Sequence, residues 1–313
     1  MIIDGAEREV AYDAIGDLRF SPDGQRLAFG GRRAGQWFVV LDGSAGKAYD
    51  GLGTGNLVFG PDGRLAFAAK TGDRWVVVVD GREGSVYEGI TDASIVFSPN
   101  GRHMAYVARA GDKPLLVVDG RAEAVPWELV GGVTFSPDGE RLAYVANQAN
   151  RWVVVVDGRP GRTYDGIVEG SLRFSSDSRR FAYGATVGGK TMVVIDGHEG
   201  MPYDGLTGLT FSPDSKRFAY AAARDDRRFV IIDGVEEGPY DGFGEGLVFS
   251  PDSRRLAYPA RAGKEWFVVV DRNVGVRHEG LVTGSRIVFT GPDRLRYLVG
   301  RGGTIFLIEE QLM

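Results

Sequence analysis

The chain has 313 residues, of which 43% are hydrophobic, and its formal net charge is −5. It contains no cysteine, which excludes disulfides, thiolate catalysis and zinc sites with cysteine ligands. The mild negative charge argues against a nucleic-acid binder, because such proteins are usually basic. The sequence has no apolar run long enough for a membrane span and no N-terminal signal pattern. We therefore expect a soluble protein without a membrane span, and the sequence as written slightly favours the cytoplasm.

One string of residues recurs eight times along the chain. Its clearest copy, Phe135 to Tyr144, reads Phe-Ser-Pro-Asp-Gly-Glu-Arg-Leu-Ala-Tyr. The aromatic residues that anchor the copies are Phe20, Phe59, Phe97, Phe135, Phe174, Phe211, Phe249 and Phe289, at intervals of 37 to 40 residues. A nearly constant period of this length indicates repeated structural units stacked along the chain.

Each repeat contains four short runs of strand-forming residues. In the fourth repeat these runs are 132–135, 141–146, 152–156 and 162–164, rich in Val, Phe and Tyr. The Ser-Pro-Asp-Gly string after the first run is typical of a type I turn, and the Asp-Gly pair after the third run is typical of a hairpin. The third runs are apolar on both faces, so we expect them to be buried between neighbouring sheets. Four antiparallel strands in about 38 residues are the arithmetic of a β-propeller blade.

The string at 135–144 also resembles the WD40-like propeller repeats of the periplasmic translocation protein TolB, which occur in the propellers of prolyl oligopeptidase-like enzymes as well. The likeness covers nearly the whole chain and implies a blade without implying a ligand. The chain departs from true WD40 proteins, because it lacks their Gly-His and Trp-Asp signatures. It departs from the oligopeptidases because no hydrolase domain follows the repeats. A second string, Asp-Gly-x-x-Gly-x-x-Tyr-Asp-Gly, has no role that the resemblance explains.

The repeats predict a single all-β domain over 1–313, an eight-bladed β-propeller of four-stranded antiparallel blades. The last repeat supplies only three strands, and we expect the N-terminal strand at 6–13 to complete it and close the ring. Residues 1–3 form a ninth copy of the third strand, and we expect 304–308 to take that place instead. The rival explanation, a chain cut from a longer protein, stays open. The blades are expected at about 17–51, 55–89, 93–130, 132–166, 170–205, 208–242, 246–280, and 285–309 plus 6–13.

Two repeats are irregular and are the best places to look for asymmetry. In the third, Trp127 replaces the usual strand-four Tyr, and residues 122–124 replace the turn that carries a Gly. In the seventh, Arg272 replaces a turn Gly and His278 replaces the Tyr. Neutral drift in a repeat array is the simpler explanation for both. The strand-four aromatic residues as a set are interpreted as packing between blades, with their polar tips in solvent.

In a propeller, the loops that join strand two to three and strand four to one emerge on the same face. Here the two–three hairpins are basic and carry five acids. The four–one connections carry twelve acids and no base. The basic residues of the hairpins are Arg32, Arg33, Lys70, Arg74, Arg109, Lys113, Arg151, Lys190, Arg224, Arg227, Arg228, Arg261, Lys264 and Arg301. The acids of the connections are Asp13, Asp17, Asp50, Glu88, Asp92, Glu128, Asp165, Glu169, Asp204, Asp241, Glu245 and Glu279.

Two interpretations of this charged loop face remain. In the first, the opposite charges pair with one another and act as a structural latch, each exposed pair contributing about 0–1 kcal/mol. In the second, the face binds a partner, through the basic rim of the hairpins or through acids at the mouth of the axial channel, where oxygen ligands suit a hard cation or a cationic peptide. The candidate rim residues are Arg32, Arg33, Arg227 and Arg228. The candidate channel-mouth residues are Asp17, Asp92, Glu169 and Glu245.

No constellation of catalytic or metal-ligating residues stands out. The three histidines, His103, His198 and His278, lie in different repeats, without the spacing of a zinc site. No Gly-x-Ser-x-Gly elbow or phosphate-binding loop is present. We therefore predict a monomeric, non-catalytic scaffold that binds a protein or peptide and needs no cofactor. The alternative is a ligand-binding, metal-binding or enzymatic propeller with its site at the channel mouth.

Overall fold

The computed structural model describes residues 2–3, 6–7, 12–244, 246–282 and 284–312. All regular structure in these ranges consists of β-strands, which form antiparallel sheets. The chain divides into two compact units, Met1–Arg162 and Thr163–Met313. The described residues include no helix that could cross a membrane.

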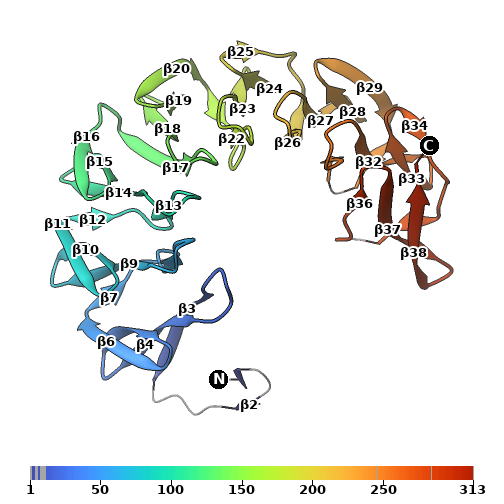
Figure 1. Ribbon diagram of the computed structural model, residues 1–313. Coiled ribbons are helices and arrows are strands. Elements are labelled where there is room, and N and C mark those ends of the chain that lie inside the picture. Colours follow the sequence, from blue (N-terminus) through green and yellow to red (C-terminus); the bar gives the residue numbers. More distant parts are fainter. Residues whose placement is uncertain (1, 4–5, 8–11, 245, 283, 313) are drawn as a thin grey trace. The chain divides into compact units, whose positions relative to one another are not determined.

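Apart from a two-stranded sheet near the N-terminus, the first unit holds four larger sheets that follow one another along the chain (Figure 1). The first contains β3 (Ala14–Phe20), β4 (Leu27–Arg33), β5 (Gln36–Leu41) and β6 (Ser44–Tyr49). The second contains β7 (Gly51–Leu52), β8 (Val58–Phe59), β9 (Leu65–Thr71), β10 (Arg74–Val79) and β11 (Arg82–Tyr87). The third contains β12 (Gly89–Ile90), β13 (Val96–Phe97), β14 (Met104–Ala110), β15 (Lys113–Val118) and β16 (Arg121–Ala124). The fourth contains β17 (Leu129–Phe135), β18 (Leu142–Gln148), β19 (Arg151–Val156) and β20 (Arg159–Tyr164), whose last residues belong to the second unit.

The second unit holds four further sheets. The fifth contains β21 (Gly166–Ile167), β22 (Arg173–Phe174), β23 (Phe181–Val187), β24 (Lys190–Ile195) and β25 (His198–Glu199). The sixth contains β26 (Gly205–Phe211), β27 (Phe218–Arg224), β28 (Arg227–Ile232) and β29 (Val235–Tyr240). The seventh contains β30 (Gly242–Phe243), β31 (Val248–Phe249), β32 (Leu256–Ala262), β33 (Glu265–Val270) and β34 (Asn273–Val274). The eighth contains β35 (Gly280–Leu281), β36 (Val288–Gly291), β37 (Arg294–Arg301) and β38 (Thr304–Gln311).

The first strand of each sheet is irregular. It is either a continuous strand with a register shift, as between Gly131 and Thr134, or two short segments that pair with the same second strand. In the eighth sheet β35 and β36 are such segments, so residues 280–311 fill three strand positions, as predicted.

The recurring Ser-Pro-Asp-Gly turn is held by its own side chains. Ser136 is fully buried, and its Oγ accepts the N–H of Arg141 at 3.0 Å and donates to the Asp138 carboxylate at 2.5 Å. At the same end of the sheet, in the turn between the third and fourth strands, Asp157 has a φ of 51° and the following Gly158 a φ of 74°, as a type I′ hairpin requires. Asp157 accepts the N–H of Leu142 at 3.0 Å and the Arg141 Nε–H at 2.9 Å, which ties the two turns together.

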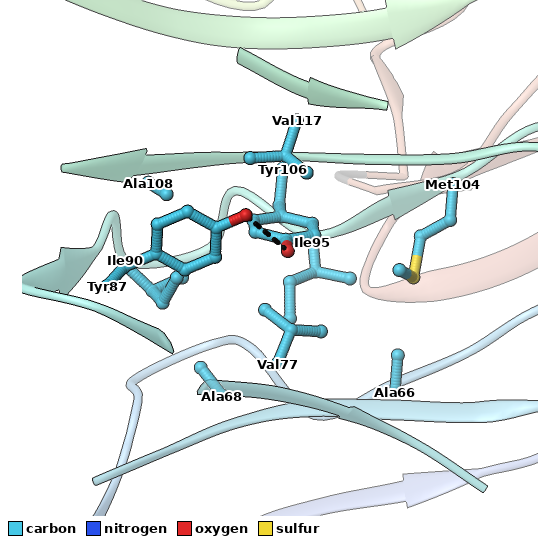
Figure 2. Packing of buried hydrophobic residues seen from close by; sticks show 10 residues of the cluster. All are labelled: Ala66, Ala68, Val77, Tyr87, Ile90, Ile95, Met104, Tyr106, Ala108 and Val117. Carbon is cyan, nitrogen blue, oxygen red and sulfur yellow. Dashed lines mark hydrogen bonds between the residues drawn. The ribbon is translucent and has the colours of Figure 1, made fainter. Parts of the chain in front are cut away.

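The hydrophobic core lies between successive sheets rather than within any one of them. Val76 and Val78 of β10 belong to a cluster shared with the first sheet, whereas Val77 belongs to a cluster shared with the third. Figure 2 shows the second cluster, in which the Tyr87 and Tyr106 hydroxyls lie 3.5 Å apart. The third strand is thus buried on both faces, as its unbroken apolar run predicts. Complete burial of each such valine stabilises the fold by about 1.5–3 kcal/mol.

The predicted closing strand, 6–13, includes residues 8–11, which lie outside the described residues. Within the described part, β2 (Ala6–Glu7) pairs with β1 (Ile2–Ile3), and these two strands form a sheet of their own. Tyr12 packs edge-on against Phe29 of the first sheet at 5.8 Å between ring centroids, the place that a strand-four aromatic residue takes on the following sheet. Closure of the ring and the single-domain boundaries stay predictions.

Candidate functional site

The acids that follow the strand-four aromatic residue share one role in all eight repeats. Each carboxylate accepts a backbone N–H from the two–three hairpin of the next sheet. The donors and N···O distances are Ala34 for Asp13 (3.2 Å), Gly72 for Asp50 (2.6 Å), Gly111 for Glu88 (2.8 Å), Ala149 for Glu128 (3.3 Å), Gly188 for Asp165 (2.8 Å), Asp225 for Asp204 (2.8 Å), Gly263 for Asp241 (2.7 Å) and Gly302 for Glu279 (3.0 Å). The predicted structural latch therefore joins carboxylates to backbone N–H groups rather than mainly to basic side chains. The charge pattern of the sequence does not reveal these backbone partners.

Pairing of these acids with basic side chains is less regular. Arg74 lies 3.6 Å from Glu88, and Lys190 and Arg227 pair with Asp204 and Asp241. The Lys190 ammonium, and then the Asp225 N–H, lower the pKa of Asp204 below its ordinary value. Through their bonds to backbone N–H groups, the eight acids fix the position of the hairpins.

The four rim arginines do not share one environment. Arg227 pairs with Asp241, and the Arg33 guanidinium lies over the Tyr12 and Phe38 rings, at 5.9 and 5.5 Å from their centroids. Arg228 donates to the Arg227 carbonyl at 3.4 Å. Arg32 is exposed, and no ion pair or hydrogen bond joins its side chain to the described residues.

Two of the four predicted channel-mouth acids accept hydrogen bonds from backbone N–H groups. Asp17 accepts the N–H of Gly55 at 2.8 Å, and Asp92 accepts the N–H of Thr54 at 3.2 Å, so both hold one loop of the second sheet. Glu169 is exposed in the second unit, and Glu245 lies outside the described residues. No group of three or more metal-ligating side chains occurs in the part of the chain that the structure describes. Ligand binding by these four acids stays a prediction.

The strand-four aromatic residues pack between sheets, but their polar tips are not in solvent. Tyr49, Tyr164 and Tyr203 are all at most 3% exposed. Their hydroxyls donate to glutamates of the next sheet, Glu83 (3.0 Å), Glu199 (3.0 Å) and Glu236 (2.9 Å). The expectation of a solvated tip is therefore wrong, because the next blade supplies an acceptor.

Two of the histidines have structural positions. His103 takes the place that Arg141 has in the fourth repeat, and its Nδ1 lies 2.7 Å from the Asp119 carboxylate. His278 is buried beside Tyr297, with 3.3 Å between Nε2 and the hydroxyl oxygen, and burial lowers the pKa of its imidazole.

Hollows open on the loop face between neighbouring sheets. One of about 240 Å³ lies between the first and second sheets beside Trp37, and one of about 320 Å³ lies between the seventh and eighth beside Trp266. A third, of about 720 Å³, is lined by the second, third and fourth sheets, including Trp75 and Pro114. Sequence reasoning missed this large pocket, although the third repeat was already marked as irregular.

The repeated antiparallel sheets, with a core between each pair inside both units, define the class as a β-propeller. No protein-family model and no curated protein sequence matches the chain. Among solved structures, a eukaryotic initiation factor is similar with a TM-score of 0.54 and 12% identity, over 97% of this chain and 89% of that chain. At this identity the likeness shows the fold alone.

Two further similar structures are the Dos1 propeller, with a TM-score of 0.45, 12% identity and coverage of 93% and 91% of the two chains, and TolB from Acinetobacter baumannii. For TolB the TM-score is 0.35, the identity 14% and the coverage 83% and 78%. Scores this low carry no argument about function. The fold is an eight-bladed β-propeller, as the repeat count predicts.

Proposed function

We propose that this propeller is a non-catalytic module that binds a protein or peptide through its charged loop face. The observation that supports the proposal is the fixed arrangement of charge on that face. All eight strand-four carboxylates hold hairpin backbone, as described above, while exposed basic side chains extend from the same hairpins. A surface that is already ordered loses little conformational entropy on binding, which favours affinity.

The basic rim supplies the first candidate contacts. Arg32 and Arg228 are exposed and make no ion pair with the described residues. A carboxylate of the partner can therefore pair with them without displacing a carboxylate of this chain. Arg33 is held over the Phe38 ring, and Arg227 is held beside Asp241. These contacts orient the two guanidinium groups. We expect the rim to contact acidic groups of the partner.

The type of repeat is a further part of this proposal. The string at 135–144 is similar to TolB-type repeats, and we propose that the blades belong to that type. This rests on the string and its period, and it favours a protein partner over a small molecule.

A pull-down tests the proposal. The intact protein is compared with a variant in which Arg32, Arg33, Arg227 and Arg228 are all changed to Glu. We expect partners recovered by the intact protein to be lost, since charge reversal replaces attraction with repulsion. Unchanged recovery would argue against the rim as the contact surface.

A matched control reverses four bases on turns at the opposite ends of the strands. Arg82, Arg121, Arg159 and Lys216 are exposed there. Changing them to Glu alters the net charge by the same amount and should leave recovery intact. Thermal unfolding of both variants shows whether each remains folded.

A further inference from the structure

The large pocket of the first unit is where the repeat pattern breaks. Its volume of about 720 Å³ compares with about 240 and 320 Å³ for the two hollows beside Trp37 and Trp266. It falls within the range of about 300–1,000 Å³ that is typical of ligand sites. It is lined by three successive sheets, whereas each smaller hollow is lined by two.

Pro114 distinguishes this pocket from the hollows beside Trp37 and Trp266. The second position of the third strand is tryptophan in four repeats, at Trp37, Trp75, Trp152 and Trp266. Proline at this position in β15 leaves the space that an indole would fill. The pocket extends across the third sheet, from Trp75 of the second sheet to Leu129 of the fourth.

Leu129 is a second departure at the same place. The residue after the strand-four acid is glycine in six repeats and alanine at Ala14, but leucine in the third. Its side chain is 58% exposed and lines the pocket beside the buried Val130. An exposed leucine where the repeat has glycine provides an apolar contact surface that packing of the blade does not need.

The charge of the pocket is mainly negative. Glu88, Asp92 and Glu128 line it together with one base, Arg109. Each carboxylate uses one oxygen for a backbone N–H, and Arg74 lies 3.6 Å from the second oxygen of Glu88. The second oxygens of Asp92 and Glu128 have no hydrogen bond or ion pair among the described residues. They can accept from a cation that enters the pocket.

We propose that this pocket binds an extended peptide segment of the partner, with an apolar side chain next to a lysine or arginine. The apolar side chain packs against Leu129 and Trp75, and the cation pairs with Glu128 and Asp92. The inference deepens the proposed function and rests on it, because it names the kind of segment that one part of the loop face takes. Charge complementarity favours a basic segment over an acidic one.

The test starts with a random-peptide library displayed on phage, selected on the full-length protein. We expect selected sequences to be enriched in Lys or Arg next to Leu, Ile, Met or Phe. The most enriched peptide is then synthesised, and its Kd is measured by fluorescence anisotropy. Pro114→Trp restores the repeat residue and fills the pocket, so we expect at least about tenfold weaker binding. Glu128→Gln should weaken binding about two- to fivefold, and added salt should do the same.

The matched control is Thr191→Trp, which places the same indole at the same strand position of the fifth sheet, away from the pocket. It should leave the Kd unchanged. Should Pro114→Trp fail to fold, Leu129→Gly removes the apolar contact by restoring the common glycine, and weaker binding is again expected.

The inference would be overturned if the selection enriched no sequence or enriched acidic ones, or if the pocket variants left the Kd of the peptide unchanged. It would also be overturned if free arginine amide displaced the labelled peptide as effectively as the unlabelled peptide does. The rim-reversal variant separates this inference from the proposed function. If rim reversal abolishes partner recovery while the pocket variants leave peptide binding intact, the loop face binds a partner and the pocket assignment is wrong.

Discussion

At the scale of single residues, one buried hydroxyl organises each Ser-Pro-Asp turn. Ser136 Oγ accepts the Arg141 N–H at 3.0 Å and donates to Asp138 at 2.5 Å. Ser136→Ala leaves the part-buried Arg141 N–H without this acceptor, and we expect the free energy of unfolding to fall by about 1–3 kcal/mol. Urea denaturation measures this loss. The exposed Ser44→Ala serves as the control, and an equal effect of both changes would contradict the proposed role of the turn.

His278 makes stability depend on pH near neutrality. Burial lowers the pKa of its imidazole below the ordinary value of about 6.5, so the fold favours the neutral form. The stability this neutral form contributes is present above about pH 6.5 and is lost as pH falls through the folded-state pKa. His278→Tyr restores the residue that most repeats carry and removes the titration. We expect the intact protein to lose stability relative to this variant between about pH 7 and pH 5, measured by urea denaturation. Parallel curves would refute the prediction.

At the scale of the strand and its turns, the string Asp-Gly-x-x-Gly-x-x-Tyr-Asp-Gly now has a physical explanation. The first Asp-Gly pair forms the type I′ hairpin, as at Asp80 and Gly81, whose φ values are 46° and 76°. Glycine is favoured at Gly84, because a Cβ there would lie only 3.2 Å from the Val77 carbonyl oxygen. The final Tyr packs between sheets and the Asp holds the next hairpin. The string thus encodes one hairpin turn, one close approach of Gly84 to the Val77 backbone, and two contacts with the next blade.

The hairpin contact can be tested at Asp50. Its carboxylate accepts the Gly72 N–H at 2.6 Å. Asp50→Ala leaves that N–H to water, and we expect a loss of about 1 kcal/mol in the free energy of unfolding, with faster hydrogen exchange at Gly72. Asp50→Asn keeps an acceptor and should lose less. Asp73→Ala, at the tip of the same hairpin, is the control and should leave exchange at Gly72 unchanged.

At the scale of the molecule, the sequence predicts the fold far better than the site. The number of blades and the turn types follow from local patterns that recur at a constant period. The contacts that fix the face depend on which groups the packing brings together. An acid such as Glu88 meets a backbone N–H 23 residues later, and the Tyr49 hydroxyl meets Glu83 in the next repeat. The pocket is a volume left by packing, although Pro114 and Leu129 are visible as breaks in the repeat.

The eighth sheet has an open edge at its third strand among the described residues. In the other repeats the third strand is largely buried, but Ile305, Phe306 and Leu307 of β38 are 61%, 45% and 55% exposed. β38 pairs with β37 alone among the described strands. An edge strand with exposed apolar side chains is prone to pair with another chain. We therefore expect residues 6–13 to supply the fourth strand, as the repeat alignment predicts.

Deleting residues 1–11 tests this closure while keeping Tyr12, which packs on the first sheet. Loss of the strand that pairs with the β38 edge should leave that edge open, and we expect Tm to fall on the order of 10 °C. The open edge should also promote association at high protein concentration, which light scattering detects. Adding a synthetic peptide of residues 1–13 should restore Tm if that segment fills the edge, whereas a scrambled peptide should not. An unchanged Tm and a monomeric deletion variant would mean that another segment, or no segment, completes the eighth blade.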